Sequence, residues 1–181
     1  MKEKLKPLKE EIEIPEGISL AIEGNELSVR KEDKEIKKKL PGVILETKDN
    51  KLILQTKKST KKEKKQINTI TAHINNMLKG LEEDFSYKLQ ICSVHFPMTI
   101  SEKEGFIAVK NFLGETKERK TKIIPGAKVK IENDIITVTS HNKEAAGQTA
   151  ANIEKLTRIK DKDRRIFQDG IFMIEKSGKK I

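Results

Sequence analysis

The residues best suited to chemistry in this sequence lie near the C-terminus, between Lys160 and Phe172. Arg164 and Arg165 are adjacent there, and a guanidinium group can hold two phosphate oxygens at once or stack on an unpaired base. These arginines therefore predict binding of phosphate groups. The alternative is that they make ion pairs within the same stretch, with one of three carboxylates: Asp161, Asp163 or Asp169.

No arrangement of catalytic or metal-binding residues is visible elsewhere. The three histidines (His73, His95 and His141) stand in unrelated contexts, and none has metal-ligand spacing to another histidine or to Cys92. Cys92 alternates with Ile91 and Val94 in a strand-like run, which favours a buried structural thiol over a nucleophile. A glycine-rich phosphate loop and a nucleophile elbow are absent. We therefore expect a protein that is not an enzyme and that holds no metal or cofactor.

Two clusters of cations extend the phosphate-binding prediction. One follows Phe112-Leu113-Gly114 in what the sequence indicates is a loop. The other runs from Lys155 to the end of the sequence, where nine Lys or Arg residues, Lys155 included, face four Asp or Glu residues. From these clusters the predicted binding residues are Lys117, Arg119, Lys120, Arg158, Lys160, Lys162, Arg164, Arg165, Lys176, Lys179 and Lys180.

The aromatic residues do not indicate a platform on which single-stranded bases stack. The chain has one Tyr and no Trp, and its six Phe residues stand mostly at strand-alternating positions. Recognition of folded RNA through phosphates and 2′-hydroxyl groups is favoured over readout of individual bases.

Composition limits the class of protein and its partners. The 181 residues carry a net charge of +10, which favours a polyanionic partner such as nucleic acid. Hydrophobic residues make up 35% of the chain. No apolar run approaches the length of a membrane-spanning helix. The single cysteine excludes an internal disulfide and fits a reducing compartment. The sequence therefore predicts a soluble, cytoplasmic, basic protein without a secretory signal.

The first half of the chain contains the elements that would carry such a site. Apolar and polar residues alternate on both sides of Gly24-Asn25 and again on both sides of Asp49-Asn50, which predicts two hairpins. Thr60-Lys61-Lys62-Glu63 has the spacing of a capping box, and an apolar helix face follows, with Gly80 as a candidate C-terminal cap. The lysine run Lys57–Lys65 is either a solvated loop and helix start or a loop that contacts phosphates.

The second half repeats this order at a nearly constant offset. Pro97 corresponds to Pro15, and Pro125-Gly126 corresponds to Pro41-Gly42. Apolar strand and helix positions correspond in the same order: Ile107 and Val109 to Leu27 and Val29, Ile136 and Val138 to Leu52 and Leu54, and Ala146, Ile153 and Leu156 to Ile67, Ile74 and Met77. Such a repeat predicts two domains of one architecture. The small residues around Gly147 on the second helix predict close packing against a sheet.

The two halves differ at their ends. All seven aromatic residues lie at or after position 85, and the stretch beyond Leu156 has no counterpart in the first half. Asp169-Gly170 predicts a turn into a last apolar strand, with Phe167, Ile171 and Phe172 contributing to the core. The expected organisation is a flexible N-terminal arm (1–13), a first α+β repeat (14–83) and a second α+β repeat with a basic C-terminal extension (84–181).

Several motifs give the chain a resemblance to a known family. In order they are Asn76-Met77-Leu78-Lys79-Gly80, Tyr87-Lys88, His95-Phe96-Pro97, Asn111-Phe112-Leu113-Gly114-Glu115, Pro125-Gly126 and Lys162-Asp163-Arg164-Arg165-Ile166-Phe167-Gln168-Asp169-Gly170-Ile171. From about Ile14 to Lys176 the chain resembles large-subunit ribosomal protein six, in the archaeal and eukaryotic branch that is numbered nine in eukaryotes. Phe172 departs from the Tyr usual in that branch, so this chain lacks the hydroxyl group and any contact that it makes.

The resemblance implies an α+β fold of two tandem similar domains, each with antiparallel sheet structure and one helix around a single core. It implies a structural constituent of the large ribosomal subunit that binds 23S-type rRNA mainly through the second domain. The expected position is near the stalk base and the sarcin-ricin loop, where translation factors dock. The expected partners are large-subunit rRNA and neighbouring ribosomal proteins, with no membrane, no small-molecule substrate and no homo-oligomer.

Two other hypotheses remain at this point. One is a basic two-domain adaptor that docks acidic protein partners without contacting RNA. The other is an RNA-modifying enzyme, for which the sequence offers no identifiable catalytic group.

Overall fold

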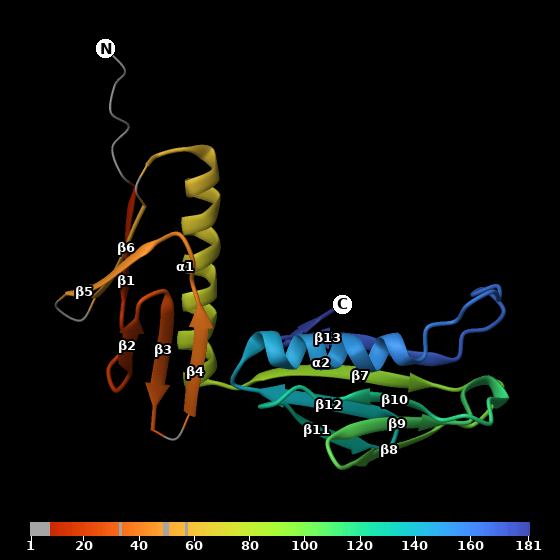
Figure 1. The fold of residues 1–181 in the computed structure, drawn as a ribbon. Coiled ribbons are helices and arrows are strands. Elements are labelled where there is room, and N and C mark those ends of the chain that lie inside the picture. Colours follow the sequence, from red (N-terminus) through yellow and green to blue (C-terminus); the bar gives the residue numbers. More distant parts are fainter. Residues whose placement is uncertain (1–7, 33, 49–50, 57) are drawn as a thin grey trace. The chain divides into compact units, whose positions relative to one another are not determined.

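The structure, a computed structural model, describes residues 8–181 except for 33, 49–50 and 57. It divides between Glu83 and Asp84 into a first and a second unit, each with its own hydrophobic core (Figure 1). Each unit combines antiparallel sheets with one α-helix. The predicted α+β fold with an internal duplication is therefore confirmed.

The first unit contains two three-stranded antiparallel sheets and one helix. One sheet has the strand order β2-β3-β4 and the other has the order β1-β6-β5. The elements are β1 (Lys9–Glu13), β2 (Ser19–Glu23), β3 (Glu26–Lys31), β4 (Lys34–Lys39), β5 (Ile44–Lys48), β6 (Lys51–Gln55) and α1 (Lys61–Glu82).

Local sequence explains most of these elements. Leu27 on β3 and Leu52 on β6 are fully buried, as the alternation of apolar and polar residues predicts. The predicted turn at Gly24-Asn25 joins β2 to β3, and Gly24 has a positive φ of 61° that costs glycine little. The capping box is also confirmed: Glu63 N donates to the Thr60 hydroxyl oxygen, and Thr60 N donates to the Glu63 carboxylate.

Three expectations for the first unit need correction or lie outside the structure. The N-terminal arm is not flexible along its final stretch, because Lys9–Glu13 pairs with β6 and buries Ile12. Gly80 does not end α1; it is buried within the helix, which continues to Glu82. The predicted turn at Asp49-Asn50 lies outside the described residues.

The second unit contains a three-stranded sheet, a five-stranded sheet and one helix. The strand orders are β10-β9-β8 and β11-β12-β7-β13-β14. The elements are β7 (Phe85–Cys92), β8 (Thr99–Lys103), β9 (Phe106–Lys110), the short 3-10 helix η1 (Phe112–Gly114), β10 (Arg119–Lys122), β11 (Lys128–Glu132), β12 (Ile135–Ser140), α2 (Lys143–Leu156), β13 (Gly170–Lys176) and β14 (Lys179–Lys180).

The two units correspond element by element. Strands β8-β9-β10 repeat β2-β3-β4, strands β7-β12-β11 repeat β1-β6-β5, and α2 repeats α1. The corresponding glycines Gly42 and Gly126 even share positive φ values of 83° and 87°. Among the described strands, β13 and β14 are the ones without a counterpart. The predicted strand after Asp169-Gly170 is therefore confirmed, although the short β14 follows it.

The small-residue face of α2 packs closely, as predicted. Ala146, Thr149 and Ala150 are fully buried. A Cβ atom added at Gly147 would lie 3.2 Å from the hydroxyl oxygen of Tyr87 on β7, so the helix has little room for larger residues there. This packing holds α2 against β7, and the charged stretch follows the helix in the sequence.

Candidate nucleic-acid interface

Three segments that are distant in the sequence meet at one end of the second unit. They follow β7 (residues 93–97), β9 (residues 111–115) and α2 (residues 157–169); we call the last segment the C-terminal loop. Asn111 donates to the backbone oxygen of Pro97 at 3.0 Å, and Asp169 accepts from His95. Three of the sequence motifs that carry the family resemblance are thus gathered into one surface.

Asp169 joins the C-terminal loop to the segment after β7. Its side chain is only 1% exposed. It accepts hydrogen bonds from Val94 N at 2.7 Å, from His95 N at 2.9 Å and from His95 Nδ1 at 2.6 Å. Burial alone would raise the pKa of this carboxyl, but the hydrogen bonds from His95 and Val94, together with the charge of His95, lower the pKa from 3.8 to about 2. Asp169 is therefore a structural group and does not pair with an arginine.

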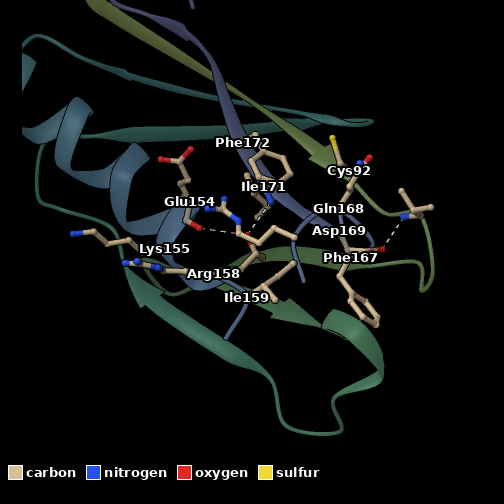
Figure 2. Close-up of a pocket in the computed structure, with 13 residues that line it drawn as sticks. Cys92, Glu154, Lys155, Arg158, Ile159, Phe167, Gln168, Asp169, Ile171 and Phe172 are labelled. Carbon is tan, nitrogen blue, oxygen red and sulfur yellow. Dashed lines mark hydrogen bonds between the residues drawn. The ribbon is translucent and has the colours of Figure 1, made fainter. Parts of the chain in front are cut away.

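The last turn of α2 holds the start of β13. Thr157 Oγ1 accepts from Ile171 N at 2.8 Å, and the Glu154 carboxylate accepts from Met173 N at 3.2 Å. Figure 2 shows Glu154 and Ile171 at this junction. Both ends of the C-terminal loop are therefore fixed by buried or half-buried partners, and most of its side chains face solvent.

The two predicted arginines have different surroundings. Arg165 is 90% exposed and forms an ion pair with Asp163 at 2.9 Å, which also accepts from Arg165 N. Arg164 is exposed and has no carboxylate within ion-pair distance in the part of the chain that the structure describes. The alternative of an ion pair thus applies to Arg165, and the Arg164 guanidinium is available to an external partner.

Other predicted residues of the C-terminal loop are also exposed. Among the described residues, no carboxylate lies within ion-pair distance of Arg158 or Lys160. Lys162 lies 4.6 Å above the ring of Phe167, and that ring contacts the ring of His95 at 5.3 Å between centroids. The structure therefore brings together Arg158, Lys160, Lys162, Arg164 and Arg165 in one exposed cationic segment.

The cluster after Gly114 lies beside the C-terminal loop but is partly occupied by internal contacts. Arg119 and Lys120 belong to the strand β10 and not to a loop. Arg119 binds the Glu115 carboxylate with two nitrogens, donates to the backbone oxygen of Leu156 at 2.6 Å and lies 4.5 Å above the Phe112 ring. Lys120 pairs with Glu118, whereas Lys117 is exposed.

The remaining predicted cations do not join this surface. Lys176, Lys179 and Lys180 lie on the hairpin of β13 and β14 and are exposed. At about 3.3 Å per residue, the length of β13 separates them from the C-terminal loop by about 20 Å. They form a separate basic patch at the other end of the strand.

Some expectations about apolar residues are wrong. Val94 is 69% exposed because β7 ends before it, at Cys92. Cys92 itself is only half-buried and not the buried thiol that was expected. Of the three residues expected in the core after Leu156, only Ile171 is buried; Phe167 is half-buried and Phe172 is 36% exposed. The alternation of a strand explains Phe172, since its neighbour Ile171 faces the core. That alternation could have identified Phe172 as a surface aromatic residue.

Most of the lysine run 57–65 of the first unit lies at the start of α1. Lys61, Lys62, Lys64 and Lys65 lie on the first turns of α1, after Thr60, whereas Lys57 lies outside the described residues.

Within the described residues, no three His, Cys, Asp or Glu side chains gather as metal ligands would. In the same part of the chain, neither helix is long and apolar enough to cross a membrane.

The fold and this surface define a class of basic, duplicated α+β proteins whose second repeat carries two extra strands and a cationic loop that is fixed at both ends. Comparison with known proteins agrees. The family described as "Ribosomal protein L6" matches residues 98–170. The chain is 42% identical over 171 residues to "Large ribosomal subunit protein uL6" of Methanobrevibacter smithii, covering 93% of this chain and 96% of the relative. It is 41% identical over 174 residues to the protein of the same name from Methanococcus vannielii, covering 95% and 96%. The chain therefore belongs to the uL6 family of large ribosomal subunit proteins.

Proposed function

We propose that this protein is a structural constituent of the large ribosomal subunit and binds 23S-type rRNA chiefly through its second unit. The observation that carries the proposal is the C-terminal loop. Its cations Arg158, Lys160 and Arg164 are exposed and lack carboxylate partners among the described residues, while Asp169 and Thr157 hold its backbone. A fixed loop presents cations to phosphates at a small entropic cost.

The position in the ribosome is part of the same proposal. Family membership supports a site near the base of the lateral stalk and the sarcin-ricin loop, where neighbouring large-subunit proteins and translation factors meet. Nothing in the described residues resembles a catalytic centre, so binding and shaping of RNA are the proposed activity. The exposed Lys117, two residues before Arg119, extends the proposed surface, whereas Arg119 serves the fold through Glu115 and Leu156.

Salt dependence of binding tests this proposal. The full chain should bind large-subunit rRNA with log K falling steeply as log salt rises, because phosphate contacts release counterions. Replacing Arg158, Lys160 and Arg164 together with Gln should reduce the slope by about one for each cation withdrawn from a phosphate, or about three in total. The matched control replaces Lys61, Lys62 and Lys65 of α1 with Gln, which removes the same charge from the first unit.

The two triple variants separate the hypotheses. If the control weakens rRNA binding as much as the loop variant does, the first unit contributes as much to binding as the C-terminal loop, and the proposal that rRNA binds chiefly through the second unit is wrong. If wild-type protein binds rRNA weakly and without salt dependence, but binds acidic neighbouring proteins, the adaptor hypothesis is correct instead.

A further inference from the structure

A groove of about 770 Å³ opens between the end of α2, the C-terminal loop and the start of β13 (Figure 2). This volume falls within the roughly 300–1,000 Å³ typical of ligand clefts. Ile159, Ile171 and Phe172 supply an apolar lining, and Lys155, Arg158 and Arg164 supply three exposed cations. We call it the loop groove.

Of the two phenylalanines that line the loop groove, Phe172 packs its ring against the backbone of Gly170. Phe172 is 36% exposed, and its ring lies over Gly170, where a Cβ atom would come within 3.1 Å of the ring. The absence of a side chain at Gly170 therefore lets the ring rest against the backbone. The neighbouring residue Ile171 is buried and its N–H donates to Thr157, so the strand that carries the ring is fixed as well.

The carboxylates that line the loop groove are already occupied. Asp169 accepts three hydrogen bonds from Val94 and His95, and Glu154 accepts from Met173 N. Both carboxylates keep their negative charge, so three cations face two anions in the lining, and the Asp169 oxygens are already turned toward Val94 and His95. A flat apolar ring beside guanidinium groups matches a planar base attached to a phosphate, because bases stack on aromatic rings and phosphate oxygens pair with arginine.

We propose that the loop groove binds one unpaired nucleotide of the RNA, with its base stacked on Phe172 and its phosphates beside Arg158, Arg164 and Lys155. This inference rests on the proposed function, since it requires that the C-terminal loop lies on RNA. It adds a base contact to a surface that otherwise recognises only the RNA backbone. It also gives Phe172 a role that its lost hydroxyl group does not affect, because stacking uses the ring.

Two RNA hairpins that differ in a single nucleotide test the inference. One hairpin is fully paired, and the other carries one bulged 2-aminopurine, whose fluorescence reports stacking. The full chain should bind the bulged hairpin about tenfold more tightly, within the range of about fivefold to a hundredfold expected for one stacked base, and should change its fluorescence. Phe172→Ala should abolish this preference, whereas Phe172→Tyr should retain it.

Phe106→Ala provides the matched control. Phe106 is 42% exposed on β9 of the same unit, so its loss removes a similar aromatic surface away from the loop groove. Equal binding of both hairpins by the wild-type chain, with a steep salt dependence, would overturn the nucleotide site and leave the proposed function intact. Equal weakening of both hairpins by Phe172→Ala would also overturn it. Failure to bind either hairpin or large-subunit rRNA would overturn both proposals.

Discussion

Replacing Asp169 with Asn should destabilise the second unit selectively. The carboxylate is buried, and it joins the start of β13 to Val94 and His95 through three hydrogen bonds. An amide can still accept from the two backbone N–H groups through its oxygen. The amide loses the negative charge of the carboxylate. Its NH₂ group takes the position opposite His95 Nδ1, where the wild type has a carboxylate oxygen.

The lowered pKa of Asp169 gives the magnitude of the expected loss of stability. A fall of the pKa from 3.8 to about 2, at about 1.36 kcal/mol for each pKa unit, corresponds to about 2 kcal/mol of stability that depends on ionisation. Because the folded-state pKa lies below the unfolded-state value, this stability is present above about pH 4 and is lost as the pH falls toward 2. For a unit of this size, such a loss lowers the melting temperature by about 8–16 °C.

A single fluorophore makes the measurement specific to the second unit. The chain has one tyrosine and no tryptophan, and that tyrosine is Tyr87, buried in β7. Urea unfolding followed by tyrosine fluorescence therefore reports the second unit alone. At pH 7 the midpoint of Asp169→Asn should lie well below that of the wild type, and between pH 4 and pH 2 the variant should lose much less further stability.

Asp163→Asn is the matched control, because this aspartate of the C-terminal loop is exposed. Within the described residues, it bonds to Arg165 and to local backbone groups. It should change the unfolding midpoint little. An Asp169→Asn variant as stable as the wild type at pH 7, or one with the same acid sensitivity between pH 4 and pH 2, would refute the role assigned to this carboxylate.

Two further predictions concern one unit each. Thr60→Ala removes the capping box of α1, so the free energy of unfolding of the first unit should fall by about 1 kcal/mol. Circular dichroism should show helix loss at a lower urea concentration, while the midpoint of Tyr87 fluorescence stays unchanged. A shift of both signals would contradict independent cores. Burial raises the pKa of Tyr87, so phenolate absorbance should appear only above the pH at which free tyrosine ionises. Because the folded state favours the neutral phenol, the stability of the second unit should fall as the pH rises past the pKa of free tyrosine. Ionisation of Tyr87 at the pH typical of free tyrosine would show that its ring is accessible to solvent.

Sequence patterns predicted the elements whose signals are local. Leu27 and Val29, like Ile107 and Val109, alternate with other residues along a strand and are fully buried. The capping box at Thr60 depends on four consecutive residues, and the structure contains it. The turns that follow Pro41 and Pro125 reflect the preference of glycine for positive φ.

The elements that sequence patterns missed depend on distant partners. Strand β4 has the sequence Lys-Glu-Ile-Lys-Lys-Lys, and it is a strand because Ile36 is buried opposite Val29 of β3. Strand β1 also contains many charged residues, so its sequence lacks the apolar alternation typical of a strand. It forms because it pairs with β6. Gly80 suggested a helix end, but α1 continues past it to Glu82 with Gly80 buried, so packing against the core outweighs the low helix propensity of glycine there.

Sequence patterns predicted the candidate site only in part, because some of its contacts join residues that are distant in the chain. Adjacent arginines at 164 and 165 can be recognised in the sequence alone. The hydrogen bonds from Val94 and His95 to Asp169 join residues 75 and 74 positions apart, and no local pattern indicates them. The loop groove likewise follows from how β13 lies beside β7 and α2, whereas the exposure of Phe172 could have been predicted from the alternation along its strand.

The position of β13 beside β7 also bears on how the chain acquires its structure. In the first unit Ile12 of β1 pairs with Leu52 of β6, whereas in the second unit Ile91 of β7 pairs with Ile171 of β13, twice as far along the chain. Doubling the length of a closing loop adds about 0.6 kcal/mol of entropic cost, so the second sheet should close more slowly than the first. During synthesis β7 emerges long before β13, and until then one edge of β7 offers unpaired N–H and C=O groups to other chains. The segment that follows the charged loop is therefore also the one that protects the nascent second unit from edge-to-edge association.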